Sequence, residues 1–101
     1  MAINIKAVTN AMGYEQITSL SAAAALSPPS TTKTGLAAKP TFALIVAETQ
    51  AIRWRDDGID PTATVGMPLA AGATLQYDGD LTRIRFIEQT ASAKVNVSYY
   101  D

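Results

Sequence analysis

The sequence predicts an all-β fold, a small β-sandwich or jelly-roll-like domain, on two observations. Apolar and polar residues alternate with a period of two in several separate runs, and no run has the 3.6-residue period of an amphipathic helix. Asp-Gly pairs, glycines and prolines separate these runs, as in sandwiches whose strands recur about every 8 to 12 residues. We therefore expect about seven or eight short strands and at most one turn of helix.

The chain has 101 residues, which suits one domain because single cores usually serve about 50 to 200 residues. We expect a single β domain over residues 1–101. Residues 1–41 would hold variable N-terminal strands and a Pro/Ser/Thr-rich loop, and residues 42–101 would hold the core strands.

The N-terminal part is expected to contain two extended segments followed by a loop. Residues 14–18 indicate a strand. The Ala-rich residues 19–26 combine helical propensity with an extended setting, and we favour an extended edge. Residues 27–35 contain two prolines and a Ser/Thr cluster, which cannot sustain a hydrogen-bonded ladder and therefore predict a loop.

The middle of the chain predicts five strands. Residues 42–47 are apolar at every position, which predicts a central strand covered on both faces, or one packed against a neighbouring subunit. Residues 51–55 alternate, so that Ile52 and Trp54 point inward and Arg53 and Arg55 outward. Shorter strands are expected at residues 63–65, 67–69 and 74–77.

Two further alternating runs complete the predicted sandwich. In residues 82–86, Ile84 and Phe86 point inward, and Arg83 and Arg85 point outward. In residues 94–100, one face carries Val95, Val97 and Tyr99, and the other carries Asn96, Ser98 and Tyr100. The predicted core layer consists of Trp54, Ile84, Phe86, Val95 and Val97.

Aspartates gather where turns are predicted. Asp-Gly is a strong hairpin signal, and it occurs in residues 56–58 and 78–80. These two segments contain Asp56, Asp57, Asp78 and Asp80, and Asp60 follows the first of them. Their spacing is not that of an EF-hand, so we assign them to turns and expect no metal and no cofactor.

The composition argues against an enzyme. The chain has no His and no Cys, which removes the usual general base near neutral pH and thiolate chemistry. Carboxylates in turns are not in the apolar pockets that raise a carboxyl pKa, and no Lys has a neighbouring Ser motif. Eight Lys and Arg against nine Asp and Glu give a net charge of -1, which is too balanced for nucleic acid.

Membrane association is not expected either, because the Ala-rich run ending at Leu26 is shorter than the about 20 apolar residues that a span requires. The N-terminus lacks the pattern of a secretory signal, so we expect synthesis in a cytoplasm.

The four arginines are the candidate interface residues, together with Tyr100. Arg53, Arg55, Arg83 and Arg85 could form an anion-binding stripe, a solvated face paired with Glu48 and Glu88, or a subunit contact. The aromatic residues offer a separate candidate, a sugar-stacking platform of Trp54, Tyr77, Tyr99 and Tyr100. Since Trp54 and Tyr99 lie on predicted core faces, a structural role is the favoured interpretation for them.

The last sixty residues resemble small structural proteins of tailed bacteriophages. The pattern that carries the resemblance is A-x-R-W-R-D-D-G in residues 51–58, followed by P-T-x-T-x-G, R-F-I and V-N-V-S-Y-Y. The resemblance implies a structural virion protein, and head decoration (cement) proteins of this class are small, β-rich and oligomeric. It implies no catalytic residue.

On this resemblance we expect a capsid decoration subunit on the virion surface, made in the host cytoplasm, that contacts the major capsid protein or other virion proteins. A tail or connector accessory protein and a carbohydrate-binding sandwich module are the alternatives. Only 17% of the residues are charged, against about 25% in typical domains, which favours a surface partly covered by a partner. We expect a homo-oligomer, with a trimer favoured, and an N-terminal segment up to Gly35 that reaches a neighbouring subunit.

Overall fold

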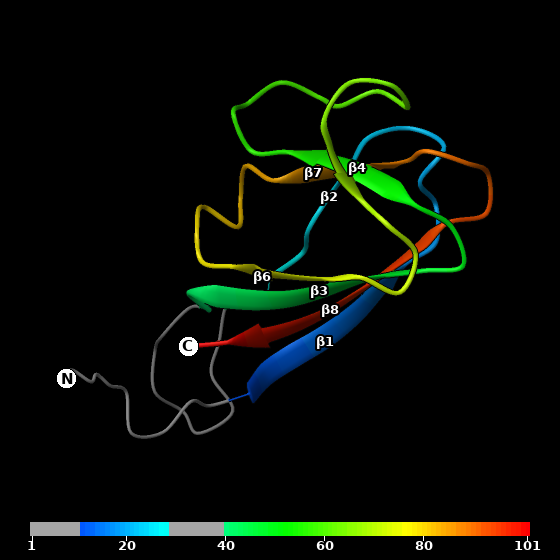
Figure 1. Cartoon of the computed structure of the whole chain (residues 1–101). Coiled ribbons are helices and arrows are strands. Elements are labelled where there is room, and N and C mark those ends of the chain that lie inside the picture. Colours follow the sequence, from blue (N-terminus) through cyan, green and yellow to red (C-terminus); the bar gives the residue numbers. More distant parts are fainter. Residues whose placement is uncertain (1–10, 29–39) are drawn as a thin grey trace, which may run out of the picture.

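The computed structural model describes residues 11–28 and 40–101, which form eight β-strands and no helix. The strands are β1 (Ala11–Ile17), β2 (Ala24–Ala25), β3 (Phe42–Glu48), β4 (Ile52–Arg55), β5 (Met67–Leu69), β6 (Thr74–Tyr77), β7 (Arg85–Glu88) and β8 (Lys94–Tyr100). They form two layers that face each other (Figure 1). The predicted all-β sandwich is therefore confirmed.

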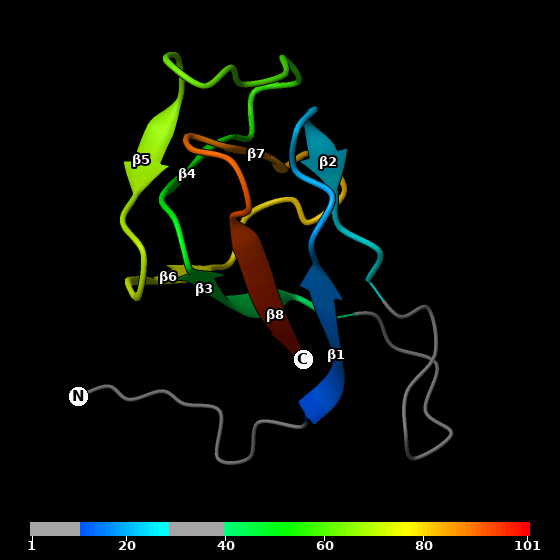
Figure 2. The ribbon, with the colours of Figure 1, turned by 90° about the vertical axis from the view of Figure 1, so that its right-hand side faces the viewer.

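The strand order is that of a jelly roll. One sheet, called sheet A, has the order β1-β8-β3-β6, and the other, sheet B, has the order β2-β7-β4-β5. The antiparallel pairs β1 with β8, β2 with β7, β3 with β6 and β4 with β5 are those of one long hairpin rolled over itself. Figure 2 shows β2 and β5 at opposite edges of sheet B.

The core lies between the sheets and follows the predicted alternation. In β8, Val95 and Val97 have no exposed surface, and Tyr99 is buried beside them. Phe86 of β7 and Ile84 just before it are also fully buried. Trp54 is half-buried and packs against this cluster. Each predicted core residue therefore lies in or against the core.

Strand β3 occupies an interior position in sheet A, between β8 and β6. Its inward side chains, Ala43, Ile45 and Ala47, have no exposed surface. Its outward side chains are also apolar, namely Phe42, Leu44 and Val46, and each is half-buried. The outer face of sheet A therefore carries an apolar row along its centre.

The N-terminal strands belong to the sandwich itself. Strand β1 pairs with β8 along its length, and Ala24 of β2 pairs with Phe86. Leu20 and Leu26 are buried in the same core cluster. The expectation that the segment up to Gly35 is ordered by a neighbouring subunit is therefore wrong for residues 11–28, and the rest of that segment lies outside the described residues.

A buried side-chain hydrogen bond adds to the backbone pairing between β1 and β8. The buried Tyr99 hydroxyl donates to the carboxylate of Glu15, which also accepts a 2.8 Å hydrogen bond from the Ser27 amide. Burial, followed by this hydrogen bond, raises the pKa of Tyr99. The Glu15 carboxylate therefore joins β1, β8 and the residues after β2.

Two predicted strands differ from the structure because local side-chain hydrogen bonds form turns. The Asp80 carboxylate accepts hydrogen bonds from the Thr82 amide at 2.9 Å and its hydroxyl at 2.5 Å, which lowers the pKa of Asp80. This Asx turn delays β7 until Arg85, so the strand begins three residues later and ends two residues later than the predicted range 82–86. Arg83 lies in the turn, exposed, and not on a strand face.

Residues 63–65 also form a turn, and the prediction of a strand there is wrong. The Thr62 hydroxyl accepts hydrogen bonds from the Val65 amide at 3.0 Å and the Thr64 amide at 3.3 Å. Strands β5, β6 and β8 have the predicted bounds.

The Asp-Gly signal at residues 78–80 marks a turn but not a hairpin, because this connection crosses from β6 in sheet A to β7 in sheet B. Consecutive strands pair only across the β4–β5 loop among the described residues. The structure contains, in the same ranges, no helix that could cross a bilayer.

Candidate functional site

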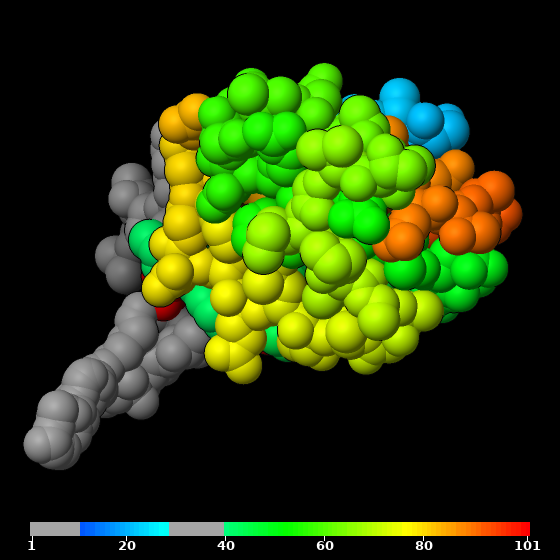
Figure 3. Space-filling model, turned by 45° about the horizontal axis from the view of Figure 1, so that its top comes forward, coloured from blue at the N-terminus to red at the C-terminus, as the bar shows by residue number. Residues whose placement is uncertain are grey.

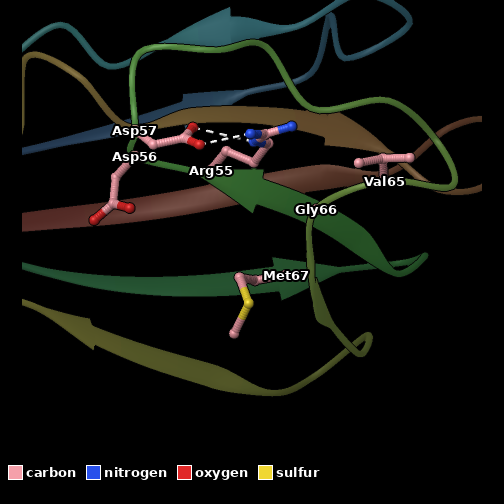
Figure 4. Close-up of a pocket in the computed structure, with 6 residues that line it drawn as sticks. All are labelled: Arg55, Asp56, Asp57, Val65, Gly66 and Met67. Atoms are coloured by element: carbon pink, nitrogen blue, oxygen red, sulfur yellow. Dashed lines mark hydrogen bonds and ion pairs between the residues drawn. The ribbon is translucent and has the colours of Figure 1, made fainter.

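The β4–β5 loop (residues 56–66) encloses an open cleft of about 370 Å³ beside the edge of sheet B. Six residues line it: Arg55, Asp56, Asp57, Val65, Gly66 and Met67. Figure 4 shows the Arg55 and Asp57 side chains facing each other, with Val65 contributed by the end of the loop and Met67 by the start of β5. In Figure 3 this green to yellow-green segment occupies the centre of the viewed face.

One side of the cleft is polar. Arg55 donates two hydrogen bonds to Asp57, at 3.1 Å from Nε and 2.5 Å from Nη2. The hydrogen bond from Arg55 lowers the pKa of Asp57 and raises that of Arg55. Because both groups are solvated, the pair fixes the orientation of the two side chains more than it stabilises the fold.

The other side of the cleft is apolar and exposed. Val65 and Met67 are 52% and 56% exposed, and Ile59, in the same loop, is 56% exposed. Only one other large apolar side chain among the described residues, Tyr14, is exposed to this degree. The sequence patterns did not identify these three residues as candidate site residues. Isolated apolar residues among Asp, Gly, Pro and Thr are a signal that could have predicted their exposure.

Arg53 holds the loop in place. Its guanidinium donates to the carbonyl oxygens of Ala63 at 3.1 Å and Gly66 at 2.8 Å. Reciprocal backbone hydrogen bonds of 2.9 and 3.3 Å between Thr62 and Val65 close the turn. The cleft wall that presents Val65 is therefore fixed by hydrogen bonds to the sheet and within the turn.

Asp56 connects the cleft to the opposite sheet. Its Oδ2 accepts a 2.7 Å hydrogen bond from the hydroxyl of Tyr77, which is 7% exposed at the end of β6. Burial, followed by this hydrogen bond, raises the pKa of Tyr77 to about 12. The Tyr77 ring also meets Trp54 edge-on, with ring centroids 6.0 Å apart.

The five candidate interface residues do not share one surface. Arg53, Arg55 and Arg85 lie on the outer face of sheet B, where Arg55 and Arg85 are direct cross-strand neighbours. Arg83 lies in the β6–β7 connection, against Gly58. Tyr100 is on the outer face of sheet A, with its ring centroid 5.7 Å from that of Phe42.

One of the three alternatives for the arginines, their pairing with Glu48 and Glu88, is not formed. Arg55 pairs with Asp57, and Arg85 donates instead to the carbonyl oxygens of Thr82 and Ile84. Glu48 accepts a 2.8 Å hydrogen bond from the Asn96 side chain, and Glu88 accepts one from the Ser92 amide. Register decides this outcome, because β4 and β7 place an arginine opposite an arginine.

A sugar-stacking platform of the four aromatic residues is not formed. Trp54 and Tyr77 pack against each other, and Tyr99 is buried in the core. Tyr100 lies on the far side of sheet A from that core. Within residues 11–28 and 40–101, no group of three or more Asp or Glu side chains could hold a metal ion.

Comparisons of the chain with protein-family models, curated proteins and solved structures gave no match.

Proposed function

We propose that the chain is a structural protein of a tailed-phage virion, a capsid decoration (cement) subunit that stabilises the head by contacts with the major capsid protein or other virion proteins. The resemblance of residues 42–101 to such proteins suggests this role. The jelly-roll strand order supports it, since many viral capsid domains have this fold. Because lectin domains share the fold, the fold alone does not decide the function.

The observation that carries the proposal is the apolar outer row of sheet A. Phe42, Leu44 and Val46 follow one another on the solvent side of β3, where a one-sided antiparallel strand would be polar. Tyr100 lies beside Phe42, and Tyr14 of β1, which is 65% exposed, lies on the same face opposite Ser98. In the neighbouring positions of β8, Ser98 and Asn96 are uncharged.

A second copy of the chain is the proposed occupant of this face. The row carries no net charge, because the formal charges of Glu48 and Lys94, which lie opposite each other in register at its end, cancel. An uncharged apolar face fits another apolar face, and burying it adds to the small core of a chain of 101 residues. We favour a trimer, because capsid shells offer threefold and quasi-threefold sites between capsomers.

Light scattering of the purified chain tests the assembly. The wild type and Ala25→Asp, which alters an exposed residue on sheet B, are expected to have the mass of three chains. Leu44→Asp is expected to have the mass of one chain, and Val46→Thr, which keeps the side-chain shape, a weakened assembly. A wild type with the mass of one chain at all concentrations contradicts the assembly.

Heating virions of the phage that encodes the chain tests the role in the capsid. Particles made without the protein are expected to release their DNA at a lower temperature, and to regain the normal value when purified protein is added. Negative-stain images of the two kinds of particle distinguish a head position from a tail or connector position. Unchanged heat resistance contradicts the cement role.

The carbohydrate-binding alternative is less well supported, because the four aromatic residues that would form its platform are separated between the core and two faces.

A further inference from the structure

We propose that the cleft of the β4–β5 loop is a docking site for a partner protein segment that presents a large apolar side chain next to a Lys or Arg. The apolar side chain would lie against Val65 and Met67, and the cation would pair with Asp56. This inference goes beyond the virion role, because sheet A carries the contact proposed above and the cleft lies at sheet B.

The first argument is the concentration of exposed apolar surface. Of the four large apolar side chains that are most exposed in the described residues, three lie within the nine residues from Ile59 to Met67. Two of these three, Val65 and Met67, line the cleft, whereas Ile59 lies outside it. Single exposed apolar residues are ordinary, but neighbouring ones beside a cavity mark interaction sites. The volume of about 370 Å³ is at the lower end of the range of ligand-binding pockets.

The second argument is that the apolar wall is pre-organised. The Arg53 guanidinium is used for two carbonyl oxygens of the loop, and the Thr62–Val65 hydrogen bonds close the turn that presents Val65. A flexible loop could bury its apolar side chains against the protein surface, whereas these hydrogen bonds hold this loop with Val65 exposed. A partner that binds here pays little to order the loop.

The third argument is charge. The lining has two carboxylates, Asp56 and Asp57, and one guanidinium, Arg55, which is bonded to Asp57. Asp56 accepts only the Tyr77 hydroxyl through Oδ2 among the described residues, so its other oxygen has acceptor capacity for a ligand cation. Figure 4 shows the Asp56 carboxylate turned away from the Arg55–Asp57 pair.

Nuclear magnetic resonance titration of the full ¹⁵N-labelled chain with short peptides tests the site. The probe is the blocked tetrapeptide Ala-Leu-Lys-Ala, and three controls replace its Lys by Gln, its Lys by Glu, or its Leu by Ser. The probe is expected to move the amide signals of residues 55–67 with a roughly millimolar dissociation constant, since the contact is small. The Gln control should bind about two- to five-fold more weakly, and the Ser and Glu controls more weakly still.

Variants with matched controls assign the two halves of the site. Asp56→Asn retains an acceptor for Tyr77, and its affinity for the probe should be no higher than the affinity of the wild type for the Gln peptide. Asp60→Asn makes an equal charge change outside the lining, and it should bind the probe as tightly as the wild type does. Met67→Gln should lose most of the affinity, and Ile59→Gln, equally exposed but outside the lining, should retain it.

Several results would overturn the assignment. Equal binding of the Lys and Glu peptides, or equal effects of Asp56→Asn and Asp60→Asn, would exclude the specific cation contact. Signal changes confined to sheet A, or none at all, would exclude the cleft. These outcomes do not depend on virion heating or on the mass of the assembly, so this proposal and the virion role fail separately.

Discussion

The hydroxyl of Tyr77 donates a 2.7 Å hydrogen bond to the carboxylate of Asp56, and this contact links the two sheets at one end of the sandwich. Tyr77 ends β6 in sheet A, and Asp56 directly follows β4 in sheet B. The connection matters because Asp56 also lines the cleft, so the position of a proposed binding residue is set by a buried tyrosine from the opposite layer.

This contact predicts a loss of stability at alkaline pH. The folded state raises the pKa of Tyr77 from 10.0 to about 12, so it favours the neutral phenol. The resulting stabilisation is present below pH 10, where the phenol is neutral in both states, and is lost as pH rises from 10 to 12. The loss is at most about 3 kcal/mol.

Urea unfolding at several pH values measures the effect. The free energy of unfolding of the wild type should fall between about pH 10 and 12. The free energy of unfolding of Tyr77→Phe should fall less steeply over the same range. Tyr99 contributes in the same direction, because its pKa is also raised. The free energy of unfolding of the double variant Tyr77→Phe/Tyr99→Phe should therefore fall least. Equal slopes for the wild type and Tyr77→Phe would contradict the linkage.

Arg53→Lys should destabilise the protein although it keeps the charge. An ammonium group cannot reproduce the planar fork that reaches Ala63 and Gly66 together, so at least one loop carbonyl would lose its partner. The expected cost is about 1–2 kcal/mol in urea unfolding.

Arg83→Lys is the matched control for that substitution. Arg83 is exposed in the β6–β7 connection, and its exchange should change the free energy of unfolding by no more than about 0.5 kcal/mol. Similar costs for the two lysine variants would show that Arg53 does not hold the loop.

The sequence alone was sufficient to predict the layers, because side-chain alternation in a strand is a local property. Val95 and Val97 are buried, and Asn96 and Ser98 between and beyond them are half-buried, as the period of two requires. The same signal could not set strand bounds where a side chain competes for the backbone. At Asp80 and Thr62 an oxygen captures nearby amides, and a turn replaces the strand.

The cleft was not predictable in the same way. Asp57 and Val65 line one cavity only because the loop returns to the edge of sheet B, which depends on the bonds from Arg53. Arginine pairing failed for a related reason. Strand register decides whether Arg55 lies opposite a carboxylate or opposite Arg85. The alternation of apolar and polar residues does not predict the register between strands that are distant in the sequence.

Phe86→Ala should be among the most damaging single substitutions. Phe86 is fully buried between Trp54 and Ala24, its cross-strand neighbours, so the truncation leaves a cavity at the centre of sheet B. The expected loss is about 3–5 kcal/mol of the free energy of unfolding. Thr90→Ala, in the exposed β7–β8 connection, is the control, and an equal effect of the two would contradict the inward assignment of Phe86.

Gly66→Ala should destabilise the wall of the cleft for two reasons that can be separated. Gly66 has a φ of 144°, and a Cβ there would lie 3.1 Å from the Pro61 side chain and 3.2 Å from the Trp54 carbonyl oxygen. Gly72 also has a positive φ, 83°, but a Cβ there meets nothing within 4 Å, so Gly72→Ala measures the backbone cost alone. We expect Gly72→Ala to cost about 1 kcal/mol and Gly66→Ala about 1–2 kcal/mol more, because a packed loop must also shift. Thermal unfolding gives both values, and the peptide titration shows whether the shift reaches Val65. Equal stability of the two alanine variants would show that close packing adds nothing to the backbone cost at Gly66.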